Sequence, residues 1–141
     1  MEKLGWLVRL FVLFLLVGLT SAACGGSGTP RGRTVTFVSA GNFPPTTIVG
    51  SYSARGCARD TRTLVQDAGL YYAHSTGLPG PADLYYYDMR FHYAHFEADG
   101  CTSKQLGEAM KRHLTAPQQA FLLHNVASNL HRAFRAALDA A

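Results

Sequence analysis

The chain of 141 residues is 48% hydrophobic and 16% charged, and its 13 Lys and Arg residues exceed its 9 Asp and Glu residues to give a formal net charge of +4. This length allows a single domain, and a positive charge this small and dispersed argues against nucleic acid as a partner. The three cysteines are Cys24, Cys57 and Cys101, and an odd thiol is a liability wherever disulfides form.

The N-terminus has the organisation of a secretory signal peptide. A short charged start is followed by an apolar run from Leu10 to Leu19 and then by small residues, which is the order of regions in such peptides. The run has ten residues, whereas a transmembrane helix needs about 20. The sequence therefore predicts a signal peptide over residues 1–23, with an uncleaved N-terminal anchor as the alternative.

Two kinds of cleavage site fit the residues that follow. Ser21-Ala22-Ala23 satisfies the small-x-small pattern of ordinary signal peptidase. Together with Cys24, the same stretch resembles the lipobox of bacterial lipoproteins, from which Ser21 departs because an aliphatic residue is usual there. The resemblance implies a lipid on Cys24 and an extracytoplasmic protein anchored to a membrane. Without that lipid, the protein is expected to be secreted.

The odd number of cysteines supports acylation of Cys24. If Cys24 is acylated, Cys57 and Cys101 remain as a pair, and a disulfide between them fits an extracytoplasmic location. Such a bond closes a loop of about 45 residues and contributes about 4 kcal/mol in the chain-entropy treatment. We therefore expect Cys57 and Cys101 to be bonded to each other.

Residues 24–56 are rich in glycine and include Pro30, Pro44 and Pro45. A segment of this composition buries too little apolar surface to offset the entropy lost on folding. The sequence predicts a flexible tether here. Within it, residues 34–38 alternate as a short strand or an extended arm would, and this stretch either docks on the domain or stays free.

Residues 57–141 contain the helix-capping and helix-terminating residues of a helical domain. Asp60 is suited to begin a helix that ends near Ser75, before Gly77. Pro81 at a first helical position, and capping boxes that start at Thr102 and Thr115, open three more helices. The expected fold is all-α, a bundle of about four helices over residues 60–75, 81–100, 102–114 and 115–140.

Two of these segments, residues 62–75 and 84–97, could also be read as strands. The second shows the alternation most clearly, at Tyr85, Tyr87, Met89, Phe91 and Tyr93. Length favours helices, because strands usually run about 5–6 residues. In either form the two segments are antiparallel neighbours, which brings Cys57 and Cys101 to the same end.

Aromatic side chains gather in the second expected helix. One apolar stripe at helical spacing is formed by Leu84, Tyr87, Phe91, Ala94 and Ala98. Because a bundle helix buries about one such stripe, we expect a contact surface for an envelope protein to be formed by Tyr85, Tyr86, Arg90, Tyr93 and Phe96. A crowded core from which only the tyrosine hydroxyls reach solvent is the alternative.

His92 and His95 are three residues apart on this helix. They form a metal site if Glu97 or Asp99 supplies a third ligand, or a haem-ligand pair if Met89 acts together with His92. Surface histidines without a ligand are the alternative, and no cofactor is predicted. On the last helix, His124, Ser128, His131 and Arg135 line one flank. This flank is either a solvated side of the helix, which is the favoured interpretation, or a contact for lipid headgroups, an anionic glycan or an acidic partner.

Catalytic motifs do not stand out. The sequence has no G-x-S-x-G, no glycine-rich phosphate loop in a structural context and no paired carboxylates in a recognisable one. The favoured function is a lipid-anchored, extracytoplasmic module of the bacterial cell envelope with a binding or structural role. The alternative is a small-molecule or metal-binding module that uses His92 and His95.

Overall fold

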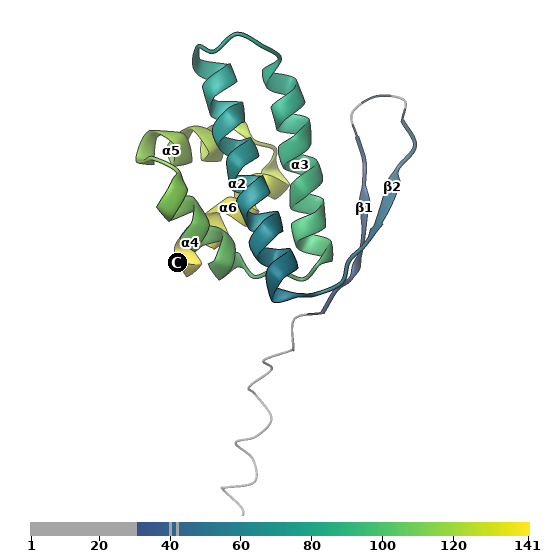
Figure 1. The fold of residues 1–141 in the computed structure, drawn as a ribbon. Coiled ribbons are helices and arrows are strands. Elements are labelled where there is room, and N and C mark those ends of the chain that lie inside the picture. The colour runs from purple at the N-terminus through teal and green to yellow at the C-terminus, as the bar shows by residue number, and fades with distance from the viewer. Residues whose placement is uncertain (1–30, 40, 42) are drawn as a thin grey trace, which may run out of the picture.

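The computed structural model describes residues 31–39, 41 and 43–141, so the predicted signal peptide, Cys24 and the first part of the predicted tether lie outside the described residues. Within them, an antiparallel hairpin precedes five helices (Figure 1). The elements are β1 (Thr34–Phe37), β2 (Thr46–Val49), α2 (Ala54–Thr76), α3 (Ala82–Ala98), α4 (Ser103–His113), α5 (Ala116–Asn125) and α6 (Ser128–Ala140). The mainly helical fold is confirmed, and the expected count of about four helices is one too low. None of the described helices has the length and apolar character needed to cross a membrane.

The two longest helices, α2 and α3, lie antiparallel and side by side (Figure 1). α2 begins earlier than predicted, because the Ser53 hydroxyl caps it by accepting a hydrogen bond from the Gly56 amide at 2.9 Å. Asp60, the predicted start, is a buried residue within the helix. α2 ends before Gly77, as expected. The helical form of both segments excludes the strand alternative.

The starts of α4 and α5 are set by local sequence. In each, an N-cap threonine accepts a hydrogen bond from the amide of a glutamine, whose side chain accepts one from the threonine amide: Thr102 with Gln105, and Thr115 with Gln118. Between α3 and α4 the chain turns at Gly100, whose φ of 73° is one that residues with a side chain rarely adopt. Both predicted capping boxes are confirmed.

The single helix predicted over residues 115–140 is wrong, because the chain forms α5 and α6 there. Val126 and Ala127 interrupt it with extended backbone, at ψ angles of 158° and 155°. Tyrosines on two other helices satisfy backbone groups at the break. The Tyr71 hydroxyl donates to the last carbonyl of α5 at 3.2 Å, and the Tyr86 hydroxyl accepts from the Ala127 amide at 2.9 Å.

The strands β1 and β2 form a hairpin that docks on α3, in place of a free tether. β1 and β2 pair antiparallel along their whole length. The buried face of the hairpin carries Phe37 and Ile48, which pack on Ala94 and Ala98 of α3. This part of the predicted tether is ordered because its alternating apolar residues find a partner in α3, which composition alone does not reveal.

The main core lies where the α2–α3 pair packs against α4, α5 and α6. Its buried members are Leu64, Val65, Ala68, Met89, Phe96, Leu106, Met110, Leu114, Leu122, Leu130, Phe134 and Ala137. α4 and α6 approach closely at Gly107, where an added Cβ would lie 1.8 Å from the Ala137 carbonyl oxygen.

Candidate functional site

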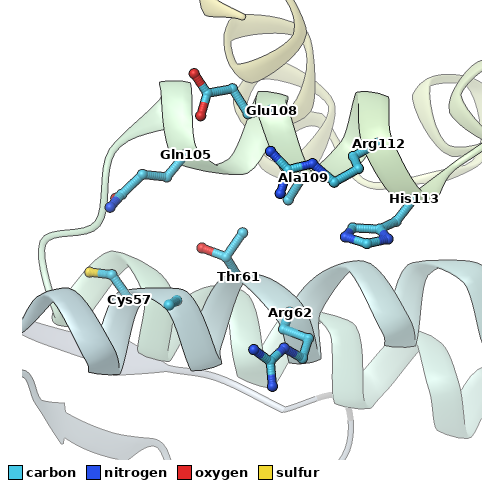
Figure 2. A pocket seen from close by; sticks show the side chains of 9 residues that line it. Cys57, Thr61, Arg62, Gln105, Glu108, Ala109, Arg112 and His113 are labelled. Carbon is cyan, nitrogen blue, oxygen red and sulfur yellow. The ribbon is translucent and has the colours of Figure 1, made fainter.

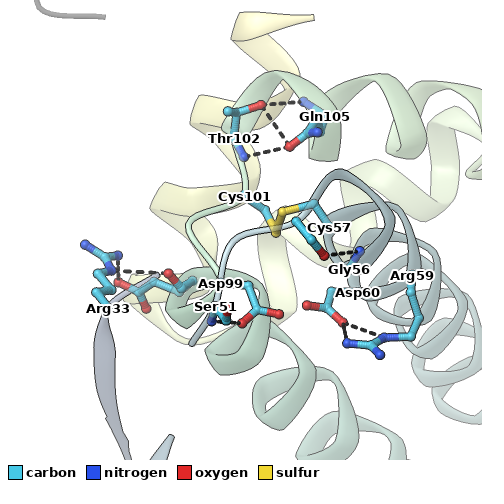
Figure 3. Close-up of a disulfide and its surroundings, with 12 residues drawn as sticks. Arg33, Ser51, Gly56, Cys57, Arg59, Asp60, Asp99, Cys101, Thr102 and Gln105 are labelled. Carbon is cyan, nitrogen blue, oxygen red and sulfur yellow. Dashed lines mark hydrogen bonds and ion pairs between the residues drawn. A yellow bond between two sulfur atoms is a disulfide. The ribbon is translucent and has the colours of Figure 1, made fainter. Parts of the chain in front are cut away.

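The end of the bundle where α2 begins and α3 ends is tied by the predicted disulfide (Figure 3). Cys57 and Cys101 are bonded, with their sulfur atoms 2.06 Å and their Cα atoms 5.4 Å apart. The hairpin is fastened at the same end. The Arg33 amide donates to the Ala98 carbonyl at 2.6 Å, and the Arg33 guanidinium pairs with the Glu97 carboxylate. The predicted disulfide is therefore confirmed.

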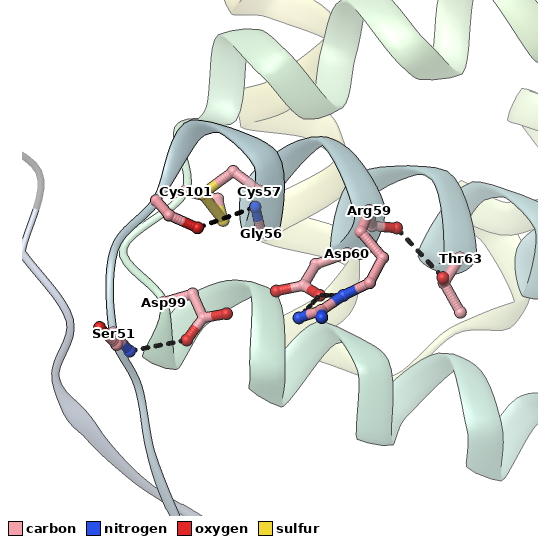
Figure 4. A network of polar contacts seen from close by, with 9 residues as sticks. Ser51, Gly56, Cys57, Arg59, Asp60, Thr63, Asp99 and Cys101 are labelled. Carbon is pink, nitrogen blue, oxygen red and sulfur yellow. Dashed lines mark hydrogen bonds and ion pairs between the residues drawn. A yellow bond between two sulfur atoms is a disulfide. The ribbon is translucent and has the colours of Figure 1, made fainter.

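Beside the disulfide, the carboxyl groups of Asp60 and Asp99 face each other (Figure 4). Asp60 is buried, and its Oδ1 accepts hydrogen bonds from Nε and Nη2 of Arg59, both at 3.1 Å. Its Oδ2 has no hydrogen-bond partner among the described residues, whereas Asp99 Oδ1 accepts from the Ser51 amide at 2.9 Å. Burial, and after it the neighbouring Asp99 carboxyl, raises the pKa of Asp60 against the opposite effect of Arg59.

Replacing Asp60 with asparagine is expected to stabilise the protein at neutral pH. Because the pKa of Asp60 is higher in the folded than in the unfolded chain, the stability it contributes is complete below about pH 4 and is lost as the pH rises through the folded-state pKa. Asparagine does not ionise, and its amide is able to donate to the Asp99 carboxylate. The thermal midpoint at pH 7 should rise by about 3 °C, and stability should fall less steeply between pH 4 and pH 7.

The exposed Asp139 provides the matched control for this substitution. Asp139→Asn removes the same charge from the surface of α6 and should shift the midpoint by no more than about 1 °C. Differential scanning calorimetry over the pH range measures both variants. A lower midpoint for Asp60→Asn at pH 7 would mean that the ion pair with Arg59 outweighs the burial of the charge.

His92 and His95 lie on α3, where their rings contact different neighbours. His92 Nδ1 lies 2.5 Å from Oδ2 of Asp67 on α2, and the His95 ring meets Phe91 edge-on, with the centroids 4.7 Å apart. Burial raises the pKa of Asp67, although the contact with His92 opposes this. In the part of the chain that the structure describes, no group of three His, Cys, Asp or Glu side chains is placed to hold a metal ion. Met89 is fully buried in the main core.

The aromatic contact surface predicted on α3 is not exposed as expected. Phe96 is buried in the main core, and Tyr86 and Tyr93 are partly buried against the same core. Tyr85 stacks on His74 of α2, with the ring centroids 4.4 Å apart. Most of these rings therefore pack within the bundle, where their contacts hold α3 against its neighbours.

The opposite face of α3 carries the hairpin. Phe37 packs edge-on against Tyr87 and Phe91, with centroid distances of 5.5 Å and 5.4 Å. Arg90, also predicted to belong to a contact surface, donates from Nη2 to the Val38 carbonyl at 2.8 Å. The stripe predicted to face the bundle core thus faces the hairpin from Tyr87 to Ala98, because α3 is apolar on two sides, whereas its first residue, Leu84, is exposed.

The polar flank predicted on one long helix is divided by the break between α5 and α6. His124 belongs to α5, whereas Ser128, His131 and Arg135 belong to α6. His131 Nδ1 lies 2.6 Å from the Leu123 carbonyl oxygen, which links the two helices. The continuous helical flank expected from the spacing therefore does not form.

Two adjoining cavities lie between α2 and the segment of α4 and α5, and we call them together the α2–α4 groove. The first has a volume of about 270 Å³ (Figure 2), and the second has a volume of about 330 Å³. Arg62 and His113 line both cavities. The lining also includes Thr61, Glu108 and Arg112 in the first cavity, and Val65, Gly69 and Leu114 in the second.

The first cavity is bordered by positive charge from two helices. None of the ion pairs between described residues involves Arg62 or Arg112. Glu108, the acidic residue of the lining, lies 4.0 Å from Lys104. Thr61 projects between the two helices (Figure 2), is 5% exposed, and has no hydrogen-bond partner for its Oγ1 among the described residues. The groove therefore combines available cationic groups with a buried hydroxyl.

Sequence patterns alone do not identify the residues of the α2–α4 groove. Arg62 and Arg112 lie on the polar sides of two separate helices, and only the packing of α2 against α4 brings them to one cavity. The sequence feature that could have indicated these arginines is that each is adjacent, on its helix, to apolar core positions. That arrangement is common to most amphipathic helices, so it does not single out a site.

Comparison of the chain with known protein families, with characterised proteins and with solved structures finds no match. Function is therefore inferred from the chemistry of its own residues. The features that bear on function are the disulfide end, the buried carboxyl groups of Asp60 and Asp67, and the α2–α4 groove.

Proposed function

We propose that this protein is a lipid-anchored, extracytoplasmic binding module of the bacterial cell envelope. The disulfide carries the proposal, because it pairs Cys57 with Cys101 and leaves Cys24 as the remaining cysteine of the chain. A structural disulfide is typical of an oxidising compartment, where a free thiol would be open to exchange with it. Acylation of Cys24, after the lipobox-like Ser21-Ala22-Ala23, removes that thiol.

The α2–α4 groove supports a binding role. One of its cavities, of about 330 Å³, lies at the lower end of the range of about 300–1,000 Å³ in which small-molecule sites fall, and the other, of about 270 Å³, is slightly smaller. The lining supplies positive charge and apolar contact from rigid helices, which hold binding groups more firmly than loops do. The metal-binding alternative gains no support, because no group of three His, Cys, Asp or Glu side chains among the described residues is placed to hold a metal ion.

Cys24 is expected to carry the lipid that anchors the protein. In bacteria that express the full chain and take up an alkyne-tagged fatty acid, the wild type should be labelled, and Cys24→Ala should reduce the label to background. Stable anchoring needs two acyl chains, because a single one gives only marginal membrane binding. The diacylglyceryl group on Cys24 would supply both, so Cys24→Ala should also move most of the protein from the membrane to the soluble fraction. In-gel fluorescence and fractionation measure the two effects.

The double variant Cys57→Ala/Cys101→Ala is the matched control for the labelling. It removes two cysteines and keeps Cys24, so it should retain the wild-type label. Equal labelling of the wild type and Cys24→Ala, or an unlabelled wild type, would contradict the lipid anchor.

A further inference from the structure

We propose that the α2–α4 groove binds an anionic amphiphile. Its phosphate or carboxylate head lies between Arg62 and Arg112, and its apolar chain lies along Val65 and Leu114. This ligand class rests on the binding role proposed above and is independent of the lipid on Cys24.

The two arginines provide the site for the head group. Arg62 and Arg112 come from different helices and line the same cavity. Guanidinium groups bind phosphate and carboxylate through paired, charge-assisted hydrogen bonds. Neither arginine is engaged in an ion pair with a described residue, and Glu108 has Lys104 at 4.0 Å. The border of the cavity is therefore positive and favours an anion.

Thr61 adds a second, independent indication of a polar ligand at this cavity. Its Oγ1 is buried and has no hydrogen-bond partner within the described part of the chain. Buried hydroxyl groups are nearly always hydrogen-bonded, because an unsatisfied one loses its interactions with water and gains none. An anionic head group drawn in by the arginines would bring an acceptor to this side of α2.

The second cavity provides the site for the chain. It shares Arg62 and His113 with the first cavity, so a chain attached to the head group continues into it. Val65 and Leu114, both buried core residues, form its apolar wall. Gly69 leaves room there, since an added Cβ would meet only Leu114 Cδ2, at 3.8 Å. An inorganic anion would leave this apolar space unused.

Isothermal titration with three small probes tests the proposal. The full-length protein, in phosphatidylcholine nanodiscs if it is membrane-bound, is titrated with hexyl phosphate, inorganic phosphate and hexanol, with empty nanodiscs as the baseline. Hexyl phosphate should bind at least about tenfold more tightly than inorganic phosphate, because its methylene groups leave water. Hexanol should not bind measurably. Arg62→Gln/Arg112→Gln should weaken hexyl phosphate binding by at least about tenfold.

Two further variants separate the site from general effects. Arg132→Gln/Arg135→Gln removes the same charge from exposed positions of α6 and should leave the affinity within about twofold of wild type. Gly69→Leu fills the second cavity and should abolish the preference for hexyl phosphate over inorganic phosphate while phosphate still binds. Circular dichroism establishes that each variant is folded. Equal weakening by the two arginine pairs, or no binding of hexyl phosphate to the wild type, would overturn the proposal.

The source of the amphiphile is decided by competition. Phosphatidylglycerol vesicles that displace hexyl phosphate would identify a bilayer lipid, and vesicles that do not would identify a free amphiphile; both results retain an anionic amphiphile as the ligand. If the wild type takes up no fatty-acid label but binds hexyl phosphate, the proposed lipid anchor is wrong and the proposed groove ligand stands. If the wild type is labelled but does not bind hexyl phosphate, the groove ligand is wrong and the lipid anchor stands.

Discussion

Replacing both Cys57 and Cys101 with alanine is expected to lower the free energy of unfolding by about 4 kcal/mol. The bond joins residues separated by 44 positions, and its removal returns the conformational entropy of that loop to the unfolded chain. Because a domain is stable by only about 5–15 kcal/mol, the double variant should lose a large part of its stability. Urea unfolding of the two proteins, followed by circular dichroism, measures the difference.

Reduction of the wild type is the control for this comparison. Cys57 is fully buried, so alanine there also leaves a small cavity, whereas dithiothreitol opens the bond without removing atoms from the core. The reduced wild type should lose nearly as much stability as the double variant. A loss below about 1 kcal/mol would mean that the reduced, unfolded chain retains structure that keeps this loop closed.

The elements that the sequence predicts correctly are set by residues close together in the chain. The capping boxes at Thr102 and Thr115 are complete within one helical turn, so their hydrogen bonds do not depend on the rest of the fold. The disulfide follows from the count of cysteines and from the antiparallel order of two consecutive helices. Neither inference requires knowledge of which helix faces which.

α3 shows why the candidate contact surface could not be predicted. Periodicity places one apolar face toward a core, but α3 is apolar on two faces. Phe96 and Met89 enter the main core, whereas Ala94 and Ala98 pack on Phe37 of the hairpin. Which aromatic residues remain exposed depends on both partners of the helix, and the hairpin lies in a segment whose composition is that of a tether.

The break between α5 and α6 and the α2–α4 groove depend in the same way on distant residues. Tyr86 accepts a hydrogen bond from Ala127 across 41 positions of the chain, and this contact favours a break where helical periodicity predicts continuity. Arg62 and Arg112 line one cavity only because α2 packs against α4. The pattern of a single sequence identifies the apolar face of a helix, but it does not identify the element that packs against that face.

Replacing Gly107 with alanine is expected to destabilise the protein by about 3 kcal/mol. An added Cβ would lie 1.8 Å from the Ala137 carbonyl oxygen and 2.8 Å from the Ala141 Cβ. The first of these atoms belongs to the backbone of α6, so the clash is not relieved by rotating a side chain. α6 must move away from α4, and that movement separates Leu130 and Phe134 from the main core.

Gly69→Ala is the matched control, because it makes the same exchange in the interior of another helix. The nearest atom to its Cβ would be Leu114 Cδ2 at 3.8 Å, an ordinary van der Waals contact. Alanine is favoured over glycine within a helix by about 1 kcal/mol, so this variant should be more stable than wild type by about 0.5–1 kcal/mol. Urea unfolding of both variants measures the contrast. The gain in helix propensity is the same for both variants. Changes of opposite sign in their free energies of unfolding would therefore come from the atoms that each added Cβ contacts. An equal increase in both variants would contradict the close approach of α4 to α6.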